Sequence, residues 1–86
     1  MNWAVHPNFT VKRLNRHQLN YSEDNYELIL EIEDLMEPYV LQIYSNYSFR
    51  WSAPHEKEEI TAEGKEQIKK NIKDALSFLN IPSEFD

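Results

Sequence analysis

Hydrophobic and polar residues alternate most regularly over residues 26–34. Side chains of a strand point alternately to its two sides, so every second residue shares a face. One face is apolar and receives Tyr26, Leu28, Leu30 and Ile32. The opposite face receives Glu27, Ile29, Glu31 and Glu33. The pattern predicts a strand with one side in a core and an acidic side toward water or a partner.

Weaker alternation flanks this strand. It predicts four further strands, at residues 9–14, 17–22, 39–44 and 47–51. Asp24 and Asn25 both tolerate a positive φ, so a tight turn is expected just before residue 26. Residues 1–8 show no period, and we expect a loosely held arm there.

A helix is predicted over residues 61–80. Thr61 is a suitable N-cap, and Pro82 cannot continue a helix, which should therefore end near Asn80. One apolar stripe follows the helical period and consists of Ile68, Ile72, Ala75, Leu76 and Leu79. This stripe gives the strands something to pack against.

The pattern predicts one α+β domain over residues 1–86. Residues 9–51 supply about five strands, whose short connections require antiparallel neighbours. The helix at 61–80 is the only cover that the pattern offers for one face of this sheet. We therefore expect two layers, an antiparallel meander covered by one C-terminal amphipathic helix.

Composition narrows the class of protein. The chain has 86 residues and 41 % apolar residues, which suits a small folded domain rather than a disordered acidic tail. Cysteine is absent, so disulfides and thiolate chemistry are excluded. The sequence has no apolar run of membrane-spanning length and no signal-peptide pattern near residue 1. We expect a cytoplasmic protein that is not bound to a membrane.

The net charge of −6 is unevenly distributed. Lys12, Arg13 and Arg16 make the first part basic, whereas residues 17–49 contain seven acidic residues and neither lysine nor arginine. An acidic surface repels nucleic acid and speeds encounter with basic proteins. The charge therefore predicts a basic protein partner and no nucleic acid.

Candidate chemistry is sparse. The single glycine, Gly64, cannot make a phosphate-binding loop, and His6, His17 and His55 lack the local spacing of metal ligands. Glu31 and Glu33 share a strand face and suit acid–base work, but a solvated face is the simpler interpretation. We expect no enzyme activity, no cofactor and no metal.

The chain resembles a known family, most specifically in its second half. Its motif is a Trp-x-x-Pro followed by acidic residues, an Ile, and a helix of the form Ile-x-x-Asn-Ile-x-x-Ala-Leu. The matching positions are Trp51, Pro54, Glu56, Glu58, Glu59, Ile60, Ile68, Asn71, Ile72, Ala75 and Leu76. The resemblance, which spans residues 14–80, is to immunity protein 74 of bacterial polymorphic toxin systems. It implies a non-catalytic antitoxin that binds a cognate toxin, and the acidic surface favours a basic toxin such as a nuclease.

These observations define candidate contacts. The expected partner-binding residues are Glu27, Ile29, Glu31, Glu33, Asp34, Trp51 and Glu56. Trp51 has two interpretations, packing between sheet and helix or contacting the partner, and we favour packing. The alternative function is a self-associating domain that forms a homodimer through an exposed edge strand, either 17–22 or 47–51.

Overall fold

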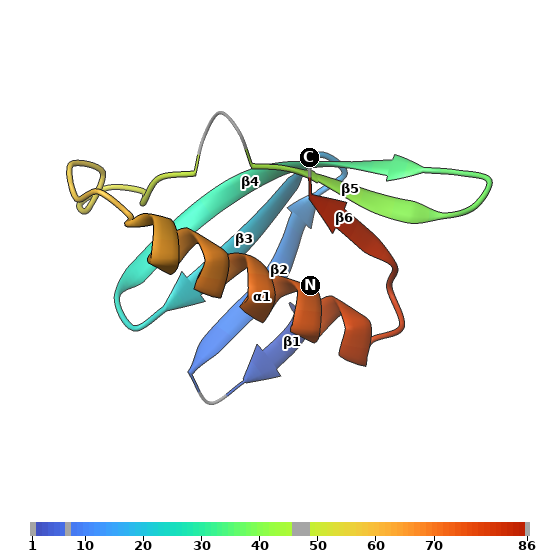
Figure 1. The fold of residues 1–86 in the computed structure, drawn as a ribbon, viewed down its shortest axis with the longest axis horizontal. Coiled ribbons are helices and arrows are strands. Elements are labelled where there is room, and N and C mark those ends of the chain that lie inside the picture. Colours follow the sequence, from blue (N-terminus) through green and yellow to red (C-terminus); the bar gives the residue numbers. More distant parts are fainter. Residues whose placement is uncertain (1, 7, 46–48, 86) are drawn as a thin grey trace.

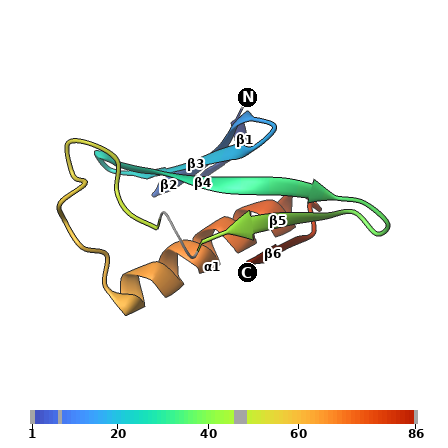
Figure 2. The ribbon, with the colours of Figure 1, turned by 90° about the horizontal axis from the view of Figure 1, so that it is seen from above.

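Six strands and one helix form the described part of the chain, which covers residues 2–6, 8–45 and 49–85 of a computed structural model (Figure 1). The elements in chain order are β1 (Asn2–His6), β2 (Phe9–Asn15), β3 (Gln18–Glu23), β4 (Tyr26–Leu35), β5 (Val40–Tyr44), α1 (Ala62–Phe78) and β6 (Ser83–Phe85). The strands join in the order β1-β2-β3-β4-β5-β6. Figure 2 shows α1 on one side of this sheet.

The predicted fold class is confirmed. Strands β1 to β5 form an antiparallel meander, and one helix covers one face of it. β6 differs from the expected all-antiparallel pattern because it pairs with β5 in parallel. A parallel neighbour needs a long crossover, and α1 with its flanking segments provides one.

The N-terminal expectation is wrong for β1. We expected an arm over residues 1–8, whereas Asn2–His6 pairs with β2 in antiparallel fashion. The pairing is irregular between Asn2 and Ala4, where the register shifts. A strand of 5 residues with a bulge is too short to show a clear period in sequence.

The predicted strand over residues 47–51 is also wrong where it can be checked. Residues 47 and 48 lie outside the described residues, and Phe49–Trp51 is not a strand. The segment is instead fixed to β4, because the Ser52 N–H donates to the Glu27 carbonyl oxygen at 2.7 Å. Trp51 packs beside Tyr26, with 5.0 Å between ring centroids.

Strand β3 occupies the interior of the sheet. The segment 17–22 was a predicted edge for self-association, but Gln18–Glu23 pairs with β2 on one side and β4 on the other. The backbone of β3 is therefore paired on both sides and cannot form the edge of a dimer. The strand order makes β1 and β6 the outer strands of the sheet.

The core lies between the sheet and α1. Its sheet residues are Val11, Leu19, Tyr21, Leu28, Leu30, Ile32, Leu41 and Ile43, all nearly or fully buried. The predicted helical stripe contributes Ile68, Ile72, Ala75 and Leu76. The predicted alternation of β4 is confirmed, since its burial follows a period of two over Glu27–Glu33.

The helix begins and ends as its terminal residues predict. The Thr61 hydroxyl accepts a hydrogen bond from the Gly64 N–H at 3.0 Å, which is an N-cap. Asn80 has a φ of 60°, and the N–H of Ile81 bonds back to the Leu76 carbonyl at 2.8 Å. This left-handed cap stops the helix, and Pro82 then starts the turn into β6.

One polar link crosses the core between sheet and helix. The hydroxyl of fully buried Tyr21 donates to Glu23 Oε1 and accepts from Asn71 Nδ2, at 2.9 Å each. Gln67 Nε2 in turn donates to Asn71 Oδ1 at 3.0 Å. Burial raises the pKa of Tyr21, so the phenol stays protonated. The link fixes the position of α1 over β3.

We predict that Tyr21→Phe lowers the free energy of unfolding by about 1 kcal/mol, because it leaves the half-buried Asn71 amide without its acceptor. Tyr26→Phe is the control, since it removes only an exposed hydrogen bond to Glu58 and should lower the free energy of unfolding clearly less. Urea unfolding followed by circular dichroism measures both. Equal effects of the two substitutions would contradict the structural role of the link.

Candidate functional site

The candidate site is the sheet face opposite α1, which we call the open face. β4 supplies its central row, in which Glu27, Glu31 and Glu33 are exposed and Ile29 is half-buried. These four predicted contact residues lie together on one strand face, as expected. The row faces outward because the residues that alternate with it on β4 are buried in the core on the side of α1. These residues are Leu28, Leu30 and Ile32.

Strand register places neighbours beside this row. On β3, Gln18 pairs with Glu31, Asn20 with Ile29 and Ser22 with Glu27. On β5, Tyr44 pairs with Glu31 and Gln42 with Glu33. The open face is therefore a row of carboxylates between strips of uncharged polar and aromatic side chains.

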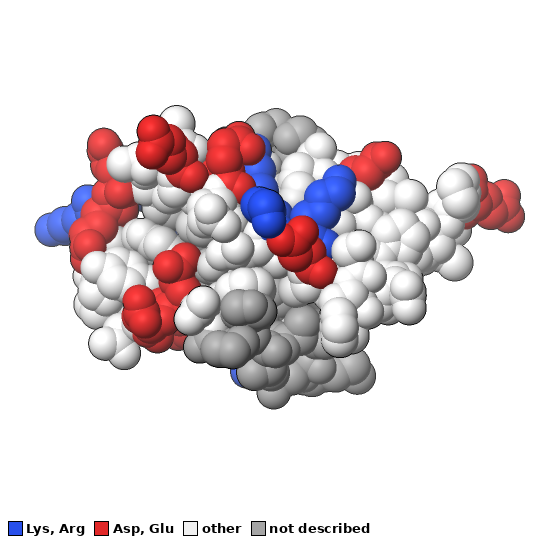
Figure 3. Space-filling model, turned by 60° about the horizontal axis from the view of Figure 1, so that its bottom comes forward, with Lys and Arg blue, Asp and Glu red and all other residues white. Residues whose placement is uncertain are grey.

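The charge of the open face is one-sided. Of the described side chains that β2 to β6 project there, Lys12 alone is basic, and it lies on β2 opposite Asn20. Glu84 of β6 pairs with Gln42 and adds a carboxylate to this face. The side that carries α1 differs, since lysines and acidic residues lie next to one another there (Figure 3).

A hollow of about 620 Å³ lies at one end of the open face. Its lining residues are Asn15, His17, Gln18, Glu31, Ile32, Glu33 and Tyr44. The Tyr44 hydroxyl donates to Glu33 Oε1 at 2.8 Å and so fixes one carboxylate at its rim. Sequence reasoning missed Tyr44 and Gln18, because only the strand register brings them beside the glutamates.

Asp34 does not lie in this row. It shares the face of Ile32, on the side of α1, where Arg13 Nη2 contacts its Oδ2 at 2.7 Å and Nη1 its Oδ1 at 3.2 Å. The Tyr39 hydroxyl donates to the same carboxylate at 2.9 Å. The hydrogen bonds from Arg13 hold the pKa of Asp34 below its ordinary value of 3.8. The Asp34 carboxylate therefore makes its contacts within the domain, with Arg13 and Tyr39.

Trp51 and Glu56 also lie away from the row. Trp51 is half-buried and packs against the core, which agrees with the favoured packing interpretation. Glu56 is exposed on the segment between Trp51 and α1. The seven predicted contacts therefore separate into four on the open face and three elsewhere.

The segment after Trp51 is held by a small polar cluster. The His55 ring stacks on Tyr26 with 3.8 Å between centroids, and its Nδ1 lies 2.6 Å from Glu58 Oε2. The Tyr26 hydroxyl donates to Glu58 Oε1 at 2.7 Å. The bonds from Tyr26 and then His55 lower the pKa of Glu58. Glu58 thus links the segment to Tyr26 of β4 through an exposed hydrogen bond.

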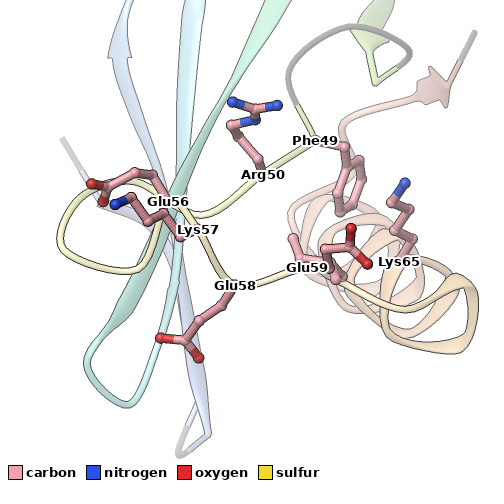
Figure 4. Close-up of a pocket in the computed structure, with 8 residues that line it drawn as sticks. Phe49, Arg50, Glu56, Lys57, Glu58, Glu59 and Lys65 are labelled. Carbon is pink, nitrogen blue, oxygen red and sulfur yellow. The ribbon is translucent and has the colours of Figure 1, made fainter.

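A second hollow, of about 350 Å³, lies between this segment and the first turn of α1 (Figure 4). Three basic side chains and three acidic side chains surround it, with Phe49 and Ile60 beside them. The charged residues are Arg50, Lys57, Lys65, Glu56, Glu58 and Glu59. The mixed charge favours no single class of ligand.

In the part of the chain that the structure describes, no group of three or more histidine, aspartate or glutamate side chains is placed to hold a metal ion. Over the same residues, no helix has both the length and the apolar character needed to span a membrane.

Comparison with known proteins adds no relative. No protein-family model matches the chain, no curated protein matches it, and no solved structure matches its fold. The resemblance to immunity protein 74 therefore stays a prediction from the residues.

The Arg13–Asp34 pair predicts a pH-dependent contribution to stability. Folding lowers the pKa of Asp34 from its ordinary value of 3.8. The stability that the ion pair contributes is therefore fully present at a pH above 3.8, and it is lost as the pH falls through the pKa of the folded state. Asp34→Asn should cost about 1 kcal/mol at neutral pH and progressively less below about pH 4. Urea unfolding at several pH values measures the difference from the natural chain.

The matched control for this prediction is Glu63→Gln, an exposed carboxylate in the first turn of α1 and outside the described ion pairs. Its effect should stay within about 0.5 kcal/mol at neutral pH. If the effect of Asp34→Asn on the free energy of unfolding is independent of pH, the ion pair does not contribute to stability.

Proposed function

We propose that this chain is a non-catalytic binding module that captures a basic protein through the open face. The observation that carries the proposal is the row of Glu27, Glu31 and Glu33 on a face that α1 leaves uncovered. Lys12 is the one described basic side chain on that face from β2 to β6. A predominantly acidic face of this kind attracts opposite charge and fixes the orientation of the partner.

The row also contains an apolar contact. Ile29 is half-buried between the glutamates, so a partner can gain apolar burial at the centre and ion pairs around it. Protein interfaces commonly combine a fully buried centre with a polar rim. A nucleic acid is disfavoured as the partner, because its phosphates would face carboxylates.

The proposed biological role is immunity, in which the chain binds and neutralises a toxin made by the same bacterium. Its support is the resemblance of Trp51–Leu76 to immunity protein 74, together with the acidic open face. A basic toxin such as a nuclease is the partner that this face suits by charge. β4 is paired with β3 and β5, so its backbone needs little ordering upon binding, which lowers the entropic cost.

Co-expression tests this role. The protein encoded by the neighbouring gene is expressed in a bacterial host with and without this chain. Rescue of growth and a complex on size-exclusion chromatography support immunity. Growth inhibition that this chain leaves unchanged, with no complex formed, refutes it.

The open face itself gives a quantitative prediction. Changing Glu27, Glu31 and Glu33 together to Gln should leave the fold intact and weaken the complex at least about tenfold, mainly through a slower association rate. The dependence of that rate on salt should fall as well. Stopped-flow or surface plasmon resonance at low and high salt measures both.

A matched control changes the same number of charges elsewhere. Glu59, Glu63 and Glu66 are exposed on the segment before α1 and on α1 itself. Their joint change to Gln should reduce affinity far less than the open-face variant. Equal losses from the two variants would mean that net charge, and not the open face, attracts the partner.

A further inference from the structure

The hollow at the end of the open face offers a specific set of groups. Glu31 pairs with Tyr44 across the β4–β5 ladder, and Glu33 lies two residues further along the same face of β4. The Tyr44 hydroxyl holds Glu33 Oε1 at 2.8 Å. One carboxylate is thus fixed in place, and the other forms no ion pair with any described side chain. Half-buried Tyr44 lies beside both on β5, since it pairs with Glu31 in the ladder and its hydroxyl reaches Glu33.

These groups match a planar cation. A guanidinium donates two parallel hydrogen bonds to a carboxylate and also stacks on an aromatic ring. An ammonium group is a compact point charge and cannot do both at once. The volume of about 620 Å³ falls in the range of ligand sites, roughly 300–1,000 Å³.

Asn20 is a further polar residue of the open face, beside the hollow rather than in its lining. The residue is 9 % exposed and lies beside Ile29, and its side chain forms no hydrogen bond within the described residues. Buried amide groups are normally hydrogen-bonded, because leaving one unmade costs free energy. None of its polar side-chain atoms is fully sealed from solvent without a partner. The amide is therefore open to a group that docks on the face.

We propose that the hollow receives an arginine side chain of the protein partner, with its guanidinium on Glu31 and Glu33 and over the Tyr44 ring. The chain beside that arginine then lies along β4, where a backbone amide reaches Asn20 and an apolar side chain covers Ile29. This inference rests on the proposed function and names the anchor of the same face. It makes the partner a protein with one defined arginine rather than any polycation.

Short peptides test the anchor directly. The probes are the tripeptide Ala-Arg-Ala with blocked ends, its lysine analogue and its uncharged citrulline analogue. Each is titrated into the isotope-labelled chain while backbone amide signals are recorded. The expected result is saturable shifts at Gln18, Glu31, Glu33 and Tyr44 with the arginine peptide, with affinity at least about threefold above lysine and no saturation with citrulline.

Variants separate specific from general attraction. Glu31→Gln with Glu33→Gln should abolish the saturable shifts, and Tyr44→Leu should remove the preference for arginine over lysine. The control is Glu63→Gln with Glu66→Gln on α1, which should bind the arginine peptide as the natural chain does. Amide signal dispersion shows whether each variant is folded. If Tyr44→Leu unfolds, the double variant Glu31→Gln with Glu33→Gln alone decides the test. Equal, unsaturable shifts with arginine and lysine overturn the proposal.

The same variants distinguish this inference from the proposed function. If the natural chain forms the complex with the neighbouring-gene protein and Glu31→Gln with Glu33→Gln binds it equally well, the arginine anchor is refuted while the binding function stands. If no complex forms with the natural chain, the proposed function fails. Loss of at least about tenfold in affinity with the double variant supports both.

Discussion

The packing of β4 against α1 is the constraint on which the rest of the structure depends. Leu28, Leu30 and Ile32 are buried, and they share one core with Ile72 and Leu76 of the helix. A small domain has a thin margin of stability, so it must bury this apolar row. Because side chains of a strand alternate, burying one row presents the other to the outside. The acidic open face is therefore a consequence of the same packing.

Two polar contacts keep this arrangement in one register. The buried link between Tyr21 and Asn71 ties α1 to β3, and the pair between Arg13 and Asp34 ties β2 to the far end of β4. Both lie on the helix side of the sheet. Neither contact involves the glutamates of the open face, of which Glu33 accepts a hydrogen bond from the Tyr44 hydroxyl.

The sequence predicts the long elements well and the short ones poorly. The alternation of β4 and the stripe of α1 extend over enough residues to establish their periods, whereas β1 and β6 are too short. Asp34 was predicted as a partner contact because of its acidic charge. The alternation of the strand already places it on the face of Ile32, and not on the face of Glu33. The neighbours that shape the hollow, such as Tyr44 beside Glu31, depend on strand register, which sequence pattern does not specify.

The two-sided character of β4 can be measured on the free chain, because the natural sequence has no cysteine. Single substitutions Leu30→Cys and Glu31→Cys place a thiol on the buried and the open face. The rate of reaction with a thiol reagent, measured under native conditions, reports the exposure of each. We predict fast reaction at residue 31 and reaction at residue 30 only through unfolding. Equal rates at the two positions, or protection at residue 31, would contradict the account.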